Sequence, residues 1–300
     1  MKHADYLSLA YYQAYRIISN FKEMKTIIKL KKLKYVGILV LLFLCSCEDV
    51  IDVDLETGDS TIVIDAEILW KKGTDGSLQT IRISRMTDYY NPEPPKVSGA
   101  QVYIEDSNGD LFTFNESSQS GLYICDNFIS QLNESYTLNV TLEDQTFTAS
   151  EKLMPVPEIN RVEQDYVKGF SGDENFEVSI FYDDSENQAN FYLTDFKANV
   201  LQYPEYILTD DDFYNGNEIE NNFSNEDLVV GDTIEIMHRG VSEQFYNYMN
   251  LVLETTSSNP FSTPPANIRG NIINQNSPDE YALGYFRLCE ANHLLYILEE

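Results

Sequence analysis

A cysteine that follows a short hydrophobic run is the residue whose chemistry this sequence identifies most directly. Residues 25–34 contain five lysines, and residues 35–44 are an unbroken run of ten apolar or small residues. A membrane-spanning helix needs about 20 apolar residues, so this run has the length of a secretory signal instead. Leu44-Cys45-Ser46-Cys47 then fits the lipobox of bacterial lipoproteins. The pattern predicts cleavage before Cys47 and lipid attachment at that residue.

The residues before the lysines do not fit a signal, because they are rich in tyrosine and include Asp5 and Glu23. Met24 stands directly before the basic stretch. We therefore predict a signal region within residues 1–46 that starts at Met24, followed by an acidic tether over residues 47–60. Acyl chains on Cys47, at about 0.8 kcal/mol per buried CH₂, would hold the protein on a bilayer. A short N-terminal hydrophobic helix or an uncleaved anchor is the alternative.

The charge balance excludes one class of partner. The chain has 20 basic and 49 acidic residues, and residues 1–46 hold eight and two of them, which leaves 12 − 47 = −35. Such a surface repels phosphate backbones, so no nucleic-acid binding is expected. A hydrophobic content of 43% with 13% aromatic residues predicts packed cores rather than disorder.

The sequence offers little for catalysis or metal binding. After residue 46 the histidines are His238 and His293, and the chain has no Gly-x-Ser-x-Gly motif and no histidine pair at metal spacing. Residues 210–218 are dense in oxygen ligands, but an EF-hand register puts Phe213 at a ligand position. We expect no catalytic residue, no cofactor and no metal. The many acids leave a hydrolase with a carboxylate pair open as the alternative.

Cys125 and Cys289 are the two cysteines that remain after the signal and the lipid site. An exported protein can join such a pair in a disulfide. The two residues are far apart in the sequence, so a disulfide and a pair of buried free thiols both remain open.

Alternating patterns predict a mainly β fold with an immunoglobulin-like antiparallel sandwich over residues 61–154. The clearest strand is 136–142, in which Tyr136, Leu138, Val140 and Leu142 share one face. Asn108-Gly109 supplies the positive φ angles of a hairpin turn. Residues 154–157, Met-Pro-Val-Pro, interrupt the strand pattern and predict a domain boundary. No tandem repeat is visible in the sequence.

Residues 155–300 are expected to form a second β-rich domain with one amphipathic helix near 242–257. Ser242 is placed to cap that helix, and Phe245, Tyr248, Met249 and Val252 follow at helical spacing. This stripe predicts packing against a core rather than a ligand site.

With these elements placed, the chain resembles the DUF4249 family of Bacteroidetes outer-membrane lipoproteins over essentially its whole length after the signal. The segments that carry the resemblance are residues 47–52, 89–100, 121–123 with 136–138, 211–218, and 259–272 followed by 282–286. Members of this family tend to be encoded beside TonB-dependent receptors. The resemblance thus implies a non-enzymatic accessory or binding partner of a TonB-dependent transporter in nutrient uptake, anchored to the bilayer by its acyl chains.

The resemblance also implies an outer-membrane location facing the cell exterior. Glu48-Asp49 directly after the lipid cysteine are similar to the export tag that sends lipoproteins of this phylum to the surface. Two other functions stay open: a cell-surface hydrolase, which predicts an acid with a raised pKa in a cleft, and a structural or adhesive surface protein.

Overall fold

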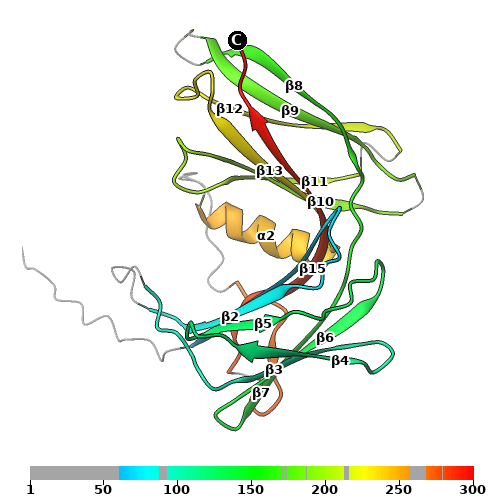
Figure 1. Cartoon of the computed structure of the whole chain (residues 1–300), viewed down its shortest axis with the longest axis vertical. Coiled ribbons are helices and arrows are strands. Elements are labelled where there is room, and N and C mark those ends of the chain that lie inside the picture. Colours follow the sequence, from blue (N-terminus) through cyan, green and yellow to red (C-terminus); the bar gives the residue numbers. More distant parts are fainter. Residues whose placement is uncertain are drawn as a thin grey trace, which may run out of the picture. The chain divides into compact units, whose positions relative to one another are not determined.

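The computed structural model describes residues 61–87, 93–169, 172, 174–186, 188–212, 216–256, 268–278 and 280–300. The signal region, the tether and the lipid site Cys47 lie outside these residues, so the predictions about them stay predictions. The described chain is mainly β with one helix, as predicted (Figure 1). Within it, no helix combines the length and the apolar character needed to span a membrane.

Two groups of seven strands follow each other along the chain. The first group is β1 (Ile62–Lys71), β2 (Gln79–Arg85), β3 (Gln101–Asp106), β4 (Leu111–Glu116), β5 (Leu122–Cys125), β6 (Ser135–Leu142) and β7 (Gln145–Lys152). The second group is β8 (Ile159–Lys168), β9 (Glu174–Asp183), β10 (Phe191–Ala198), β11 (Glu205–Asp210), β12 (Glu218–Asn225), β13 (Thr233–Val241) and β15 (Leu283–Ile297). Helix α2 (Glu243–Thr256) and the short strand β14 (Ile273–Asn274) lie between β13 and β15.

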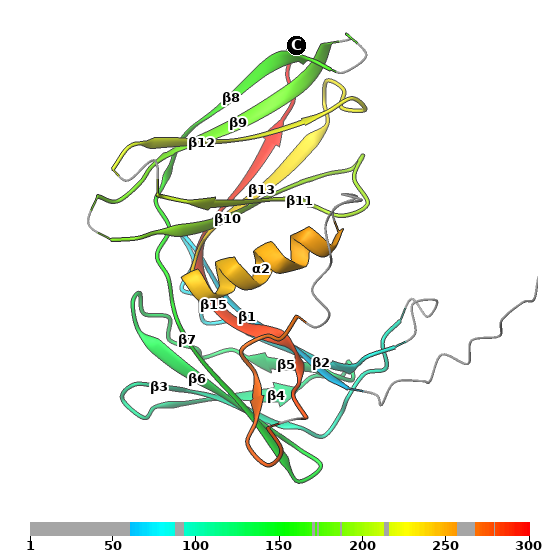
Figure 2. The same ribbon diagram turned by 180° about the vertical axis from the view of Figure 1, so that it is seen from behind.

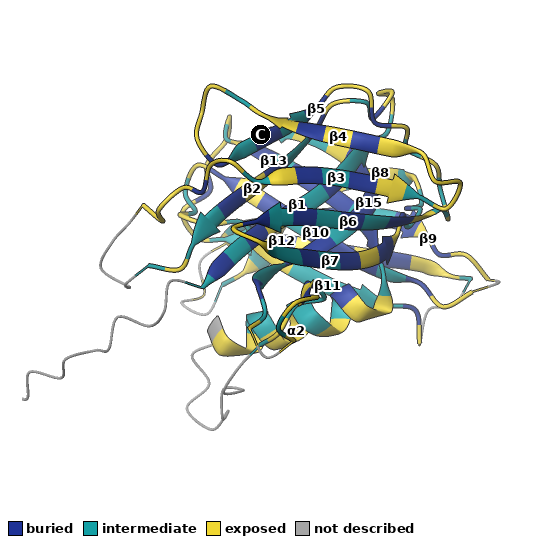
Figure 3. Ribbon diagram, turned by 90° about the horizontal axis from the view of Figure 1, so that it is seen from below, coloured by how far each residue is buried: buried dark blue, intermediate teal, exposed yellow. Residues whose placement is uncertain are grey.

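The first group forms the predicted immunoglobulin-like sandwich. Its strands run in the order β1-β2-β5-β4-β3-β6-β7, so the sheet curls round at the β5–β4 pair and closes on its own core. Buried residues alternate with partly or fully exposed ones along β3, β4, β6 and β7, as Figure 3 shows. Tyr136, Leu138, Val140 and Leu142 are all buried, which confirms the face predicted from their spacing.

Tyr136 also fixes the turn before its strand. Its hydroxyl donates a hydrogen bond to the carbonyl of Ile129 at 2.9 Å and accepts one from the backbone N–H of Gln131 at 3.0 Å. This arrangement is the tyrosine corner of immunoglobulin-like sandwiches, in which a buried phenol satisfies two backbone groups of the preceding loop.

The second group repeats the strand order of the first. Strands β8-β9-β12 form one sheet, and β11-β10-β13-β15 lie in the other, matching β1-β2-β5 and β4-β3-β6-β7 in sequence order. Between these sheets packs a separate core that includes Val178, Phe196 and Ile236. The second β-rich region therefore has the same topology as the first, although the sequence shows no repeat.

Strand β15 belongs to both sandwiches. Residues 283–291 run parallel to β1, and residues 291–297 run antiparallel to β13. Phe286 and Leu288 of this strand consequently pack in the first core, together with Ile272 and Ala282, which precede the strand. The break at Met154 does separate β7 from β8, but the C-terminal segment returns to the first sandwich. The exact division into domains stays a prediction.

Helix α2 begins where the sequence places it. The backbone N–H of Phe245 donates to Ser242 Oγ at 3.1 Å, so Ser242 caps the helix as predicted. Phe245 packs in a small cluster with Leu193, Val241 and Tyr285. The helix therefore lies between β10 and β15, as Figure 2 shows.

Candidate functional site

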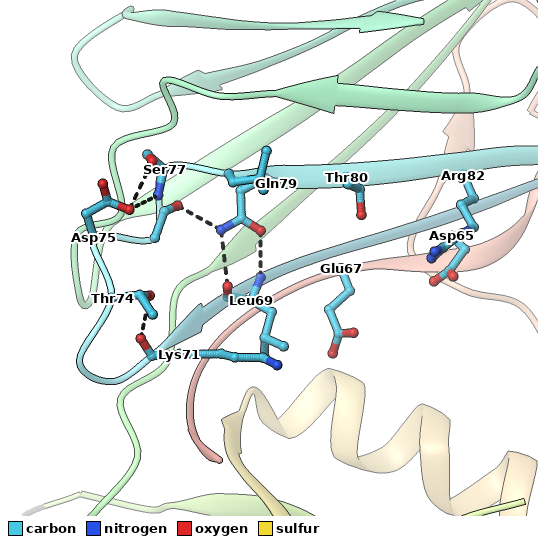
Figure 4. Close-up of a pocket in the computed structure, with 12 residues that line it drawn as sticks. Asp65, Glu67, Leu69, Lys71, Thr74, Asp75, Ser77, Gln79, Thr80 and Arg82 are labelled. Atoms are coloured by element: carbon cyan, nitrogen blue, oxygen red, sulfur yellow. Dashed lines mark hydrogen bonds between the residues drawn. The ribbon is translucent and has the colours of Figure 1, made fainter. Parts of the chain in front are cut away.

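The sheet that contains β1 and β15 has an apolar face and a charged face, and the charged face lies beside helix α2. In β1, Ile64, Ala66 and Ile68 point into the first core, so Asp65 and Glu67 point to the opposite side. The parallel register places Glu67 directly beside Arg287 of β15. Figure 4 shows Asp65 and Glu67 on the side of the sheet that faces α2.

Glu67 is the centre of a partly buried ion cluster. Its Oε1 lies 3.2 Å from Arg287 Nε and 3.3 Å from Arg239 Nε. Arg287 Nη1 also lies 3.4 Å from Asp65, and Arg239 Nη1 contacts Asp195. Burial by itself raises the pKa of Glu67, but the charges of Arg287 and Arg239 outweigh it, so the pKa is lowered and the carboxylate stays ionised.

A cavity of about 360 Å³ opens between this cluster and helix α2. Its lining combines the charged groups with apolar and aromatic side chains: Asp65, Glu67, Leu193, Tyr206, Arg239, Phe245, Tyr248, Met249, Val252, Gly284, Tyr285 and Arg287. We call it the α2 pocket. The predicted stripe on the helix thus packs through Phe245 and also lines a pocket, where packing alone was expected.

The aromatic side of the α2 pocket is fixed by ring contacts. The ring centroid of Tyr285 lies 5.1 Å from that of Phe245 and 4.7 Å from that of Tyr248. The Arg287 guanidinium lies 5.3 Å from the centre of the Phe245 ring, which ties this wall to the ion cluster.

A second pocket of about 350 Å³ adjoins the α2 pocket and shares Asp65 and Glu67 with it. It follows β1 to the β1–β2 turn. There the buried Gln79 side chain accepts from the N–H of Leu69 at 3.0 Å and donates to the carbonyl of Gly76 at 2.8 Å (Figure 4). These bonds hold the turn against the sheet, so the wall of this pocket is preformed.

A third pocket, of about 460 Å³, lies at the N-terminus of α2 and contains a buried acid. Glu151 Oε2 accepts hydrogen bonds from Ser242 Oγ at 2.9 Å and from the hydroxyl of Tyr285 at 3.4 Å. Burial raises the pKa of Glu151 despite these bonds. Glu243 is the other acid that lines this pocket.

Neither predicted histidine lies in these three pockets. His238 is fully buried in the second sandwich, with Nδ1 2.9 Å from Thr194 Oγ1 and its ring 4.1 Å from that of Tyr182. Burial lowers its pKa to about 3, so it is neutral. His293 pairs with Glu235 near the surface, at 2.9 Å.

The acids of segment 210–218 serve the structure around them. Asp210 accepts a hydrogen bond from the hydroxyl of Tyr246 at 2.8 Å, and the buried Asp211 accepts one from the N–H of Asn190 at 2.9 Å. Residues 213–215 lie outside the described residues. In the part of the chain that the structure describes, no three His, Cys, Asp or Glu side chains gather closely enough to hold a metal ion.

The sequence left a disulfide and a pair of free thiols open for the two cysteines, and in the structure both are free thiols. Cys125 and Cys289 are both buried and unbonded to each other. Cys125 lies in β5 and Cys289 in β15, and strands β1 and β2 separate them. At about 4.8 Å per strand this distance far exceeds the reach of a disulfide. The structure therefore contradicts the alternative of a Cys125–Cys289 disulfide.

Sequence reasoning missed the ion cluster altogether. Glu67 and Arg287 are 220 positions apart, and only strand pairing brings them together. One signal was present: Arg287 interrupts the apolar stretch Tyr285–Cys289, and a charge in such a place requires a partner.

A family model described as "Domain of unknown function (DUF4249)" matches residues 48–293. The curated proteins contain no match. Among solved structures, a two-domain fibronectin type-III segment of chicken tenascin is 12% identical, with 62% of this chain and 89% of that chain covered and a TM-score of 0.20. The chicken interferon gamma receptor alpha chain is 10% identical, with coverages of 60% and 87% and a TM-score of 0.19. Similarities of this size support no inference about ligand or activity.

Proposed function

The chain belongs to the DUF4249 family, and from this premise we propose that it is a lipid-anchored outer-membrane protein that faces the cell exterior. It acts as a non-enzymatic accessory of a TonB-dependent transporter in nutrient uptake. The α2 pocket holds a small solute, and the anchor at Cys47 keeps the loaded pocket near the transporter. Because anchoring raises the local concentration, weak contacts with the transporter suffice.

The α2 pocket is the observation that carries this proposal. Its floor consists of paired strands, its charges are already neutralised by one another, and its aromatic wall is packed ring against ring. A pocket that is formed before the ligand arrives loses little conformational freedom on binding. Its size falls in the usual range of about 300–1,000 Å³ for small-molecule sites.

One edge of the molecule favours a protein partner. Beyond Ala291, strand β15 has a partner on the β13 side, and no other described strand pairs with its second edge. Leu295 and Ile297, which lie on this stretch, are 66% and 59% exposed. Open strand edges with apolar side chains accept an extended segment of another protein. We call this stretch the β15 edge and assign it to the transporter.

A tagged pull-down from outer membranes in mild detergent tests the proposal. The intact protein should retain a TonB-dependent barrel in near-stoichiometric amount. Cys47→Ala should leave the membrane fraction, and Leu295→Asp with Ile297→Asp should lose the barrel. Leu111→Asp is the matched control, because Leu111 is equally exposed at 59% but lies in β4, away from this edge. Recovery of the anchored protein without a barrel would refute the accessory role.

Glu151 favours a second function, that of a cell-surface hydrolase. A buried carboxyl group whose pKa burial raises can act as a general acid, and Glu243 lines the same pocket. Hydrolysis of chromogenic glycosides or esters by the intact protein, abolished by Glu151→Gln, would establish this function. An intact protein that hydrolyses none of them leaves Glu151 as the structural partner of Ser242.

A further inference from the structure

We infer that the α2 pocket binds a neutral, ring-shaped polyol, a monosaccharide or disaccharide. The inference names the ligand class of the proposed function and rests on it for the ligand's biological use. The pocket itself supplies three arguments: its charge balance, its alternation of hydrogen-bond donors and acceptors, and its aromatic wall.

The charges around the pocket favour a neutral ligand. In the lining, Asp65 and Glu67 contribute two negative charges and Arg239 and Arg287 contribute two positive ones, and Asp195 outside the lining pairs with Arg239. Each arginine already contacts Glu67, so a ligand carboxylate would have to displace a partly buried ion pair. A cationic ligand would have to compete with the arginines that already pair with Asp65 and Glu67. The formal charge of −29 also disfavours anions at long range.

The same four side chains suit hydroxyl groups. The contacts of Arg287 with Glu67 and Asp65 use two of its five N–H donors, which leaves three for a ligand. The carboxylates beside them offer further lone pairs. A hydroxyl both donates and accepts, so a ligand with several adjacent hydroxyls can use this interleaved set without carrying a charge.

The opposite wall suits the apolar face of a sugar ring. Tyr248 and Tyr285 present packed aromatic surface, and Met249 and Val252 extend it along the helix. Tyrosine offers apolar area together with a hydroxyl at its end, which matches a ligand with C–H groups on its face and hydroxyls at its rim. The volume of about 360 Å³ admits one or two rings, and the adjoining pocket gives a second ring room to extend.

Titration of the full lipoprotein in detergent micelles with matched sugars, followed by calorimetry, tests the inference. The probes are glucose, galactose, maltose and cellobiose, with glucuronate and glucosamine as the same ring carrying one negative or one positive charge. We expect at least one neutral sugar to bind, and both charged rings to bind at least tenfold more weakly than glucose or galactose. No binding by any neutral sugar, or preferential binding of a charged one, overturns the inference.

Two substitutions on the same helix locate the site. Tyr248→Ala removes the aromatic wall and should weaken sugar binding at least tenfold, whereas Leu251→Ala, at an exposed helix position outside the pocket, should leave it unchanged. Equal affinities for both variants would place the sugar elsewhere and overturn the assignment. Failure of the pull-down with intact sugar binding would refute only the transporter role, and a retained barrel without sugar binding would refute only the ligand class.

Discussion

Replacement of Glu67 by glutamine removes the one charge that both arginines of the ion cluster share. Glutamine keeps the shape of the side chain and some of its hydrogen bonds, so the cavity and the packing should change little. Arg239 keeps Asp195 and Arg287 keeps Asp65, but the carboxylate between them is gone. The variant therefore measures the electrostatic contribution of Glu67 to stability.

The structure sets the size of the effect. Removal of one partner from a fully buried ion pair costs about 3–5 kcal/mol. The side chains of Glu67, Arg287 and Arg239 retain 25%, 22% and 11% exposure, so solvent screens part of the interaction. We expect a loss of about 2–4 kcal/mol in the free energy of unfolding at pH 7. For a protein of this size a loss of about 3 kcal/mol lowers Tm by roughly 6–12 °C.

The pH dependence follows from the lowered pKa of Glu67 in the folded protein. A carboxylate with a lowered pKa stabilises the fold fully above its unfolded-state pKa, whose ordinary value is 4.5, and loses this contribution as the pH falls through the folded-state value. The difference between the wild type and Glu67→Gln should thus be constant from pH 7 to about pH 5 and shrink below that. Denaturant unfolding at a series of pH values measures it.

Glu235→Gln is the matched control. Glu235 also pairs with two basic groups of the same sheet, His293 at 2.9 Å and Lys197 at 3.8 Å, but its side chain is 37% exposed. Exposed pairs contribute about 0–1 kcal/mol, so this variant should lose no more than that. Equal losses in both variants at pH 7 would refute the partly buried cluster. A difference that persists undiminished below pH 3 would show that packing rather than charge is responsible.

Three further predictions concern the fold. Tyr136→Phe leaves two backbone groups of the tyrosine corner unsatisfied and should lower the free energy of unfolding by about 1–3 kcal/mol, measured by chemical denaturation. Tyr166→Phe, at a half-exposed tyrosine, is the control and should cost nothing measurable. Equal losses in the two variants would contradict the tyrosine corner. Gly240→Ala should lower Tm by the equivalent of about 3 kcal/mol or prevent folding, because the Cβ of the new alanine would overlap the backbone of the β7–β8 connection. A variant with the Tm of the wild type would be inconsistent with that close contact. Cys125 and Cys289 should react with a chromogenic thiol reagent only after unfolding, because both are buried and burial raises their pKa values, that of Cys289 to about 12. If neither thiol reacts in protein unfolded without reductant, the two cysteines form a disulfide after all.

The sequence alone determined the features that depend on residues close together in the chain. Alternation along 136–142 assigned a strand and its buried face, and Ser242 with its following apolar stripe located the helix to within a residue or two. These predictions succeeded because side-chain period and capping are properties of one segment, independent of what packs against it.

Only the tertiary structure decided which strands are neighbours. Periodicity places Glu67 on the side of β1 opposite Ile64 and Ile68, but it does not say that Arg287 lies beside it and Arg239 nearby. The doubled sandwich and the double role of β15 escaped the sequence for the same reason. Strand order is set by the burial of whole faces against distant partners, and a single sequence carries no direct record of those contacts.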